Sequence, residues 1–589
     1  MHVKQIALVS LLTVSGLILL VTGIIFTIIW PGIFDNILAK ELQLTPESKS
    51  YEAWKQPPVE LNLDIYLWNW TNPEDFKNHS IKPHFEQLGP YRFRERPDKV
   101  DINFNPKNAT VTFRRLSQFF FDEEGSKGSL DDIVTSVNVV ALSAAEKARY
   151  ADYMRAKSIS VGLSIYNQQI SVTKPAGELL FEGYEDDMVS LAKQLPFLAG
   201  EDVPFDRVGW FYMRNNTPDL TGWYNMHTGV NDMSQFGALK TWNYNERNGA
   251  FQGDCGIIHG SAGEFFPPKQ SRYSTISFFS PDMCRSVPLD YEKDVEIHGV
   301  TGYKFSGGER SLDNGTIYPE NWCYAVGEGT FSGVLNISSC RFGTPVFMSY
   351  PHFYGSDPYY VNQVEGMKPN ENKHQFFMTL EPETGIPLDV AARLQLNLLI
   401  SPNPNVGIYA DVPRHFMPIL WFEQRVTTTP EITDELAMAL KVPMIGQICS
   451  IIVLIIGLIM LLWFPITKLV RHHITSNQVH MSEKGVVKII TMEELEKQNR
   501  KPENSPLLET KRNENSLKNV EFIKSSKTDI NKSFEKLPFI DTTDNTNISN
   551  EHNNEIKNEN RKSLINCDNT LNNNNNINEL EENDIKTKL

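Results

Sequence analysis

The chain has 589 residues, of which 40% are hydrophobic and 22% are charged, and its formal net charge is -16 at pH 7. An acidic surface repels phosphate backbones and other polyanions, so nucleic acid is excluded as a partner. No phosphate-loop, dinucleotide-binding, zinc-protease or paired Cys-x-x-Cys motif occurs in the sequence. We therefore expect no cofactor and no metal, and we do not predict an enzyme.

The first element is an uncharged segment between Lys4 and Asp35. A helix rises about 1.5 Å per residue, so about 20 apolar residues cross a hydrocarbon core of about 30 Å. A cleaved signal peptide is the alternative, but such peptides have a shorter apolar region, about 7–15 residues long, followed by a small-residue cleavage site. We therefore predict a transmembrane helix at 6–30 that is retained, with residues 1–5 in the cytosol.

A second apolar segment follows Lys441, and residues 444–464 are predicted to form another transmembrane helix. Lys468 and Arg471 flank it on its C-terminal side, which places that flank in the cytosol. The chain is then a two-span protein with both termini cytoplasmic, in the plasma membrane or an endosome or lysosome membrane. Residues 31–443 form an extracellular or lumenal ectodomain.

Acceptor triplets for N-glycosylation and most of the cysteines support this placement. The triplets of the ectodomain begin at Asn69, Asn78, Asn108, Asn215, Asn314 and Asn336. Four of the 6 cysteines lie in the same segment, at Cys255, Cys284, Cys323 and Cys340. Four cysteines in an oxidising compartment admit three pairings, and their spacing does not choose among them.

The ectodomain is predicted to be mixed, with strands predominating. Its clearest strand places Leu394, Leu396 and Leu398 on one face and Gln395 and Asn397 on the other. A helical insert is expected over residues 141–194. A capping box of Ser143 and Glu146 is expected to open its first helix, with further helices at 177–181 and 187–195.

The tail at 465–589 is rich in asparagine and poor in aromatic residues, a composition typical of disordered cytoplasmic segments. Within it, Glu503 precedes the pair Leu507 and Leu508 by four positions, which fits an acidic dileucine sorting signal. A sorting adaptor is the partner that such a signal would bind. The competing interpretation is chance, because short patterns occur readily in long tails.

Several strings closely resemble the class B scavenger receptor family, which includes fatty-acid translocases, a lysosomal integral membrane protein and insect sensory neuron membrane proteins. The strings are QLGPYRFRE at 87–95, FFSPDMCRS at 278–286, GTPVFMSYPHFYGSDP at 343–358, EPETGIPLDVAARLQLNLLI at 381–400 and PILWFEQ at 418–424. They occur in the family's order between both anchors, and the tail lies outside the resemblance.

The resemblance implies an α+β membrane protein, with an antiparallel β-barrel-like ectodomain, an apical helical bundle and an apolar tunnel. It also implies that Cys255 pairs with Cys323 and Cys284 with Cys340. The family's basic apical patch would fall at 158–174, where this sequence is largely neutral. That difference weakens the case for anionic lipoproteins as ligands.

The implied function is the binding of lipid or lipoprotein, with passage of lipid through the tunnel to the membrane. The lipid would be a fatty acid, sterol, phospholipid or carotenoid. Candidate contacts on the apical helices are Tyr150, Tyr153, Met154, Leu163, Ile165 and Tyr166, for which ordinary packing is the competing interpretation. The alternatives are an endolysosomal sorting receptor, or a phagocytic or recognition receptor that transfers no lipid.

Overall fold

The structure is a computed structural model that describes residues 2–57, 61–195, 205–327 and 329–483. The sorting motif at Glu503, Leu507 and Leu508 lies outside the described residues. The helices are α1 (His2–Leu42), α2 (Lys49–Lys55), α3 (Val139–Arg149), α4 (Tyr153–Ile165), α5 (Asp187–Gln194), α7 (Pro358–Gln363), α8 (Glu371–His374) and α9 (Pro430–Glu483).

Most of the strands form one antiparallel sheet, which in the described chain has thirteen strands. Its main path runs β7-β6-β3-β2-β1-β15-β14-β13-β10-β9-β8, with β12 added on β14 and β11 on β12, while β4 and β5 form a separate pair. The strands are β1 (Leu61–Trp70), β2 (Phe85–Asn105), β3 (Thr110–Phe121), β4 (Ile133–Val137), β5 (Ser171–Pro175), β6 (Tyr224–His227), β7 (Leu239–Trp242), β8 (Thr275–Ser280), β9 (Arg285–Ile297), β10 (Val300–Ser306), β11 (Val334–Asn336), β12 (Val346–Ser349), β13 (Phe377–Leu380), β14 (Pro387–Ile400) and β15 (His415–Thr427).

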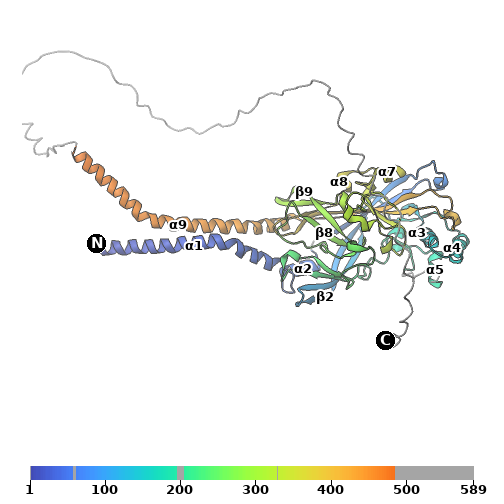
Figure 1. Cartoon of the computed structure of the whole chain (residues 1–589), viewed down its shortest axis with the longest axis horizontal. Coiled ribbons are helices and arrows are strands. Elements are labelled where there is room, and N and C mark those ends of the chain that lie inside the picture. The colour runs from blue at the N-terminus through green and yellow to red at the C-terminus, as the bar shows by residue number, and fades with distance from the viewer. Residues whose placement is uncertain (1, 58–60, 196–204, 328, 484–589) are drawn as a thin grey trace, which may run out of the picture. The chain divides into compact units, whose positions relative to one another are not determined.

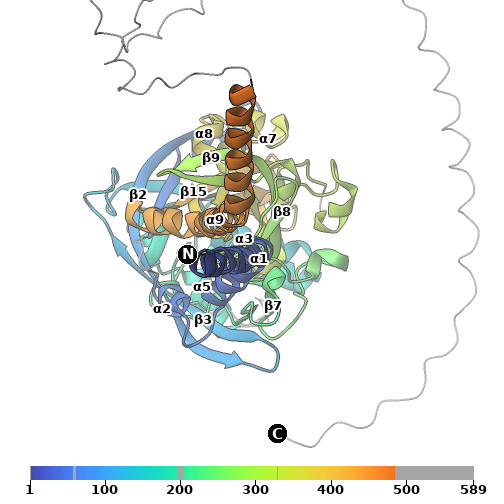
Figure 2. The same ribbon diagram turned by 90° about the vertical axis from the view of Figure 1, so that its left-hand side faces the viewer.

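A short segment brings the two ends of this sheet together. The amide of Leu239 at the start of β7 donates to the carbonyl of Gly260 (2.8 Å), and the amide of Ser261 donates to the carbonyl of Ser277 in β8 (2.8 Å). Gly260 has a φ of +80°, and a Cβ atom there would lie 2.7 Å from the Ser277 carbonyl oxygen. Only glycine fits such a position, so this residue allows the nearly closed, barrel-like sheet that Figure 2 shows end-on.

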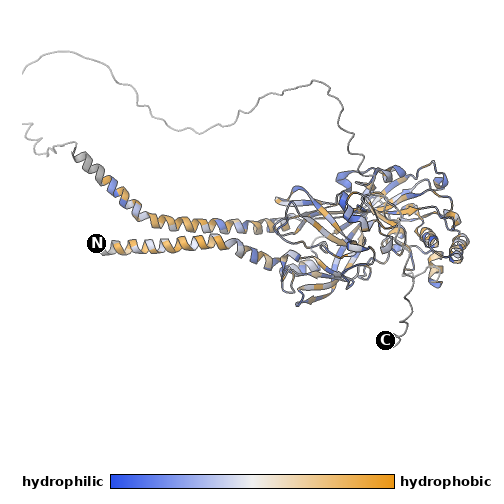
Figure 3. Ribbon diagram, viewed as in Figure 1, coloured by the Kyte–Doolittle hydropathy of each residue, from blue (hydrophilic) through white to orange (hydrophobic). Residues whose placement is uncertain are grey.

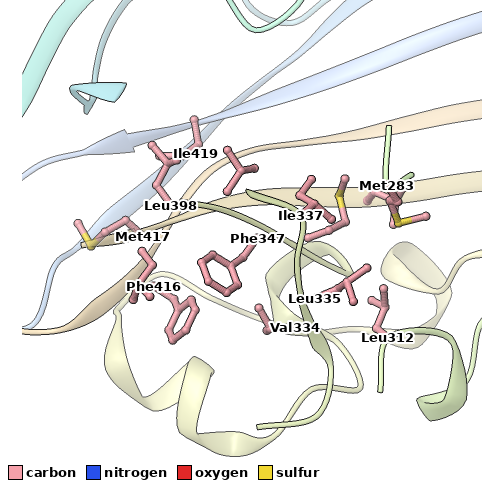
Figure 4. Close-up of a cluster of buried hydrophobic side chains, with 14 of the residues drawn as sticks. Met283, Leu312, Val334, Leu335, Ile337, Phe347, Leu398, Phe416, Met417 and Ile419 are labelled. Atoms are coloured by element: carbon pink, nitrogen blue, oxygen red, sulfur yellow. The ribbon is translucent and has the colours of Figure 1, made fainter. Parts of the chain in front are cut away.

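The buried apolar side chains of the described residues form one large cluster and three smaller ones. Figure 4 shows part of it, where Phe347 of β12, Leu398 of β14 and Phe416 of β15 pack together with Val334, Leu335 and Ile337. All of these side chains are buried. Burial of this kind supplies most of the free energy that favours folding.

The strand predicted from Leu394, Leu396 and Leu398 is β14, and both of its faces are covered, because Gln395 and Asn397 on the other face are also fully buried. The segment that follows β12 covers this face. The Asn397 side chain donates to Ser349 Oγ (2.9 Å), and the amide of His352 donates to Gln395 Oε1 (2.9 Å). The polar side chains are therefore hydrogen-bonded within the interior, as buried polar groups need to be.

The two terminal helices are both long and apolar enough to cross a membrane, over Ile6–Leu42 and Pro430–Ile474. Figure 3 shows their apolar stretches side by side. Both helices extend beyond the predicted spans on the ectodomain side. They pack closely, because a Cβ atom on Gly457 would lie 2.5 Å from the backbone nitrogen of Leu20.

The helical insert contains helices where they were expected, but its first helix begins differently. α3 starts at Val139 and is capped by Asn138, whose side chain accepts a hydrogen bond from the amide of Ala141 (3.0 Å). The predicted capping box is wrong, because Ser143 lies inside the helix and donates to the carbonyl of Val139 (2.6 Å). An asparagine is an equally good cap, and Asn138 lies five residues before Ser143.

Candidate functional site

The outer face of α4 is apolar and exposed. Met154, Val161 and Ile165 are spaced to lie on one side of the helix, and their exposed fractions are 71%, 55% and 72%. The opposite side, with Ile159 and Leu163, is buried in the bundle. Exposed apolar residues that gather on one face mark a site for an apolar partner.

Tyr150 and Tyr153 extend this surface at the start of α4, and their exposed fractions are 77% and 71%. Tyr166 adds a smaller part at the other end. Leu163 differs from the other candidate contacts, because it is only 1% exposed and packs in the core. We call Tyr150, Tyr153, Met154, Val161, Ile165 and Tyr166 the apical surface.

A cavity of about 420 Å³ opens beside the apical surface. Tyr150 and Phe342 line it and are largely exposed, so they mark its mouth. Phe347 and Leu399 line it and are buried, so they form its floor. Phe347 also belongs to the core in Figure 4, so the floor of the cavity lies on the apolar interior. Its size lies within the range of small-molecule sites, about 300–1,000 Å³.

Basic side chains surround the same cavity. Lys147, Arg149 and Arg155 line it, from the end of α3 and the start of α4. Arg149 bonds to Glu146 (3.0 Å) and to the carbonyl of Pro402 (3.0 Å), which fixes its position. Residues 158–174 are largely neutral in the sequence, and these cations precede them in the chain.

A disulfide and an ion cluster hold one wall of the cavity. Cys284 is bonded to Cys340, with Cα atoms 6.3 Å apart, and the other disulfide joins Cys255 to Cys323 at 5.9 Å. Arg341 lies next to Cys340 and donates to Asp282 (2.8 Å), which also accepts from Arg214. Although burial opposes ionisation, the two guanidinium groups lower the pKa of Asp282 below its usual range.

A buried pair of histidines lies over β14, outside the cavity. The rings of His352 and His374 stack with centroids 4.2 Å apart. The Nδ1 atom of His352 accepts from the amide of Lys368 (2.9 Å), and that of His374 accepts from the amide of Asn370 (3.0 Å). The Nδ1 atom of each ring therefore carries no proton. Burial, assisted by nearby positive charges, lowers the pKa of His352 to about 3 and that of His374 to about 4.

The glycosylation triplets fall in different surroundings. Asn78, Asn108 and Asn215 are exposed, whereas Asn69 and Asn336 are partly buried and Asn314 is 6% exposed. Asn336 lines the cavity, and its side-chain nitrogen donates to the carbonyl of Val326 (2.9 Å). A glycan on Asn336 would therefore occupy the cavity that lies beside the apical surface.

Sequence reasoning missed Val161, Phe342, Phe347 and the basic residues of the cavity. Val161 could have been predicted from the sequence, because it lies seven residues after Met154 on the same helical face. No comparable sequence pattern places Phe342 and Phe347 at this site. The cavity is built from four separate parts of the chain, and their convergence depends on the sheet topology.

These features define a class of protein: a barrel-like ectodomain anchored by a helix at each end, with an apolar docking surface beside a cavity. A family model described as the CD36 family matches residues 14–468. That match covers most of the chain, and the chain belongs to the CD36 family, the class B scavenger receptors. The two terminal helices accordingly fit a two-span membrane topology.

Curated relatives cover most of the chain. It is 45% identical over 459 residues to Protein peste of Drosophila melanogaster, covering 78% of this chain and 82% of that one. It is 32% identical over 415 residues to scavenger receptor class B member 1 of Rattus norvegicus, covering 70% and 80%. Lysosome membrane protein 2 of Rattus norvegicus is 29% identical over 448 residues, covering 75% and 91%. The second of these relatives is named as a receptor and the third as a membrane protein.

Proposed function

We propose that this protein binds lipid at the apical surface and passes it through the ectodomain to the membrane. The observation that carries the proposal is the cavity beside α4, which joins an exposed mouth at Tyr150 to a buried floor at Phe347. We propose a binding and transport role in place of catalysis.

The physical reason for such a path is the free energy of exposing an acyl chain to water. Each CH₂ group costs about 0.8 kcal/mol, so a chain of about 16 carbons faces a barrier on the order of 12 kcal/mol. A conduit lined by apolar side chains lets the lipid exchange one apolar environment for another. Two anchors would keep the exit of such a conduit close to the bilayer.

The composition of the cavity favours a lipid that has an anionic or polar head. The cavity is lined by the cations Lys147, Arg149 and Arg155 and by Glu146, and Phe347 and Leu399 line its buried side. A fatty acid or phospholipid matches this division better than a sterol ester does, because its charged group and its acyl chain find complementary surroundings. Sterols and carotenoids remain within the proposal as ligands of the apolar part.

Substitutions on α4 test the capture of lipid. Changing Val161 and Ile165 together to Asp should lower the uptake of a fluorescent fatty acid by cells that carry the full chain. Both side chains are largely exposed, so folding and surface abundance should be preserved. Changing both to Ala is the matched control and should have a smaller effect. Uptake by the Asp variant equal to that of the unchanged chain would exclude lipid capture by this surface.

A recognition receptor that binds particles and transfers no lipid is the first alternative. It would also use the apical surface, so the Asp variant would abolish capture in both cases. The two functions differ in whether lipid from a captured particle reaches the bilayer. Capture without any lipid transfer would favour the recognition receptor.

Endolysosomal sorting is a second candidate, supported by Glu503, Leu507 and Leu508 and by the similarity to a lysosome membrane protein. A sorting adaptor would bind the two leucines and Glu503. Changing both leucines to Ala should move the protein to the cell surface, as measured by surface biotinylation. An unchanged distribution would dismiss this proposal without affecting lipid transfer.

A further inference from the structure

The anchors set the height of the ectodomain above the bilayer. Asp35 lies five residues beyond Trp30, the last residue of the predicted span, and the helix is continuous. Its Cα atom is therefore about 7.5 Å beyond Trp30 along the helix axis. The headgroup layer is about 5–8 Å thick in each leaflet, so with Trp30 at the hydrocarbon edge Asp35 lies near the outer limit of this layer.

The other anchor gives the same height independently. Leu440 precedes the second predicted span by four residues, or about 6 Å along the helix. It packs against a cluster of Val300, Leu388 and Leu436, together with Ile386. The end of the ectodomain that carries Ile386 is thus held at the level of the headgroups.

One loop reaches this level beside α1. Residues 267–274, which we call the basal loop, carry Lys269, and its Nζ atom lies 2.6 Å from the Asp35 carboxylate. The loop packs on the same end of the ectodomain, since the amide of Gln270 donates to the carbonyl of Pro382 (2.7 Å). The basal loop therefore lies beside α1, at the level of Asp35.

The loop is ordered and presents a tyrosine at its tip. The amide of Tyr273 donates to Ser271 Oγ (3.2 Å), and Arg272 bonds to Asp294 (2.6 Å). Tyr273 itself is 99% exposed. The loop is ordered, yet it holds this aromatic side chain wholly outside the protein. A contact between the side chain and another molecule would explain this arrangement.

We propose that the basal loop contacts the headgroup layer of the leaflet on the ectodomain side, with Tyr273 as its interfacial anchor. Tyrosine is enriched at membrane interfaces because its ring is apolar and its hydroxyl is polar. The cations of the loop are already paired, Lys269 with Asp35 and Arg272 with Asp294. The contact therefore needs no anionic lipid. It rests on the two-span topology and is independent of lipid transfer.

The test places an environment-sensitive fluorophore at Tyr273→Cys in the full chain, with Cys449→Ser and Cys567→Ser to remove other thiols. The protein is held in phosphatidylcholine nanodiscs that contain a headgroup nitroxide quencher. Tyr153→Cys on α4 is the matched control, since it is 71% exposed and lies at the end of the ectodomain away from α1 and α9 in Figure 1. Emission should be lost at position 273 and kept at position 153. Equal emission at both positions would overturn the proposal.

A second experiment distinguishes the effect of the Tyr273 side chain from any affinity that the fluorophore itself has for lipid. The fluorophore is placed at Pro268→Cys in the same loop, with Tyr273 either unchanged or changed to Asp. Quenching should be strong with Tyr273 and weak with Y273D, because a carboxylate disfavours entry into the interface. Quenching that is equally strong in both would show that Tyr273 does not anchor the loop.

Discussion

At the scale of single residues, burial separates glycosylation triplets that look alike in the sequence. Asn78 and Asn108 are exposed, whereas the side-chain nitrogen of Asn314 donates to both the carbonyl and the hydroxyl oxygen of Thr330 (2.7 and 2.9 Å). A glycan on Asn314 would break these bonds and would have to enter the interior.

We therefore expect glycans on Asn78 and Asn108 and none on Asn314. Changing Asn78 or Asn108 to Gln should lower the apparent mass on a gel by one glycan, and this shift should vanish after enzymatic deglycosylation. Asn314→Gln should leave the glycan mass unchanged but lower stability, because it removes two buried hydrogen bonds worth about 1 kcal/mol each. A lower glycan mass for Asn314→Gln would contradict this account.

The stacked histidines predict how stability depends on pH. Both pKa values are lowered in the folded protein, to about 3 for His352 and about 4 for His374, relative to about 6.5 in an unfolded chain. Between pH 6.5 and 4 the unfolded chain binds protons that the folded chain does not. The histidine contribution is therefore fully present above pH 6.5 and is lost as pH falls, by up to about 1.4 kcal/mol per pH unit for each histidine.

His374→Asn tests this dependence, because an amide oxygen can replace Nδ1 as the acceptor for the amide of Asn370. Thermal melting of the full chain in nanodiscs should show a smaller loss of stability between pH 7 and 5 than in the unchanged protein. The exposed His259, changed to Asn, is the control and should leave the slope as it was. A slope for His374→Asn as steep as that of the unchanged chain would refute the assignment.

At the scale of elements, the two anchors form a closely packed pair. Gly16, Gly23 and Gly457 each lie against the backbone of the facing helix. Thr27 Oγ1 donates to Ser450 Oγ (3.2 Å), and Trp30 Nε1 donates to the carbonyl of Pro443 (2.9 Å). Small residues at close backbone approach and polar contacts of this kind stabilise helix pairs in lipid.

Gly457→Leu should therefore separate the helices, since even its Cβ atom would lie 2.5 Å from the Leu20 nitrogen. The measurement is oxidative cross-linking between Thr27→Cys and Ser450→Cys, in a chain that also carries Cys449→Ser. Cross-linking should be efficient with Gly457 and should fall with leucine in its place. Ile459→Leu, on the exposed side of α9, is the control that should keep it. Unchanged cross-linking in Gly457→Leu would show that the anchors do not pair here.

The type of an element could be predicted from the sequence where its local pattern was decisive. The burial of its side chains could not be predicted in this way. The alternation of Leu394, Leu396 and Leu398 predicts β14 correctly. The same alternation does not show that Gln395 and Asn397 are buried, because a pattern along one strand contains no information about the segment that covers it. The start of α3 was misplaced for a related reason: Asn138 and Ser143 are both good caps, and the local sequence does not rank them.

At the scale of the whole molecule, the two spans and the antiparallel sheet followed from apolar length, strand pattern and family resemblance. The candidate site did not, because its parts come from α3, α4, the loop around Cys340 and the end of β14. Such a site depends on which strands are neighbours, and local sequence periods do not determine that order.

The central claim is that lipid enters the ectodomain through the cavity beside α4. Ser401 allows a direct test, because it lines the cavity and its buried hydroxyl has no hydrogen-bond partner among the described residues. Ser401→Phe adds a bulky side chain to the cavity and removes no hydrogen bond. Ser401→Ala is the matched control that leaves the cavity open.

The measurement is the transfer of a fluorescent fatty acid from donor particles into liposomes that contain the full chain. Transfer should be lost in Ser401→Phe and retained in Ser401→Ala, while both variants still capture donor particles. Transfer by Ser401→Phe at the rate of the unchanged protein would contradict entry of lipid through this cavity.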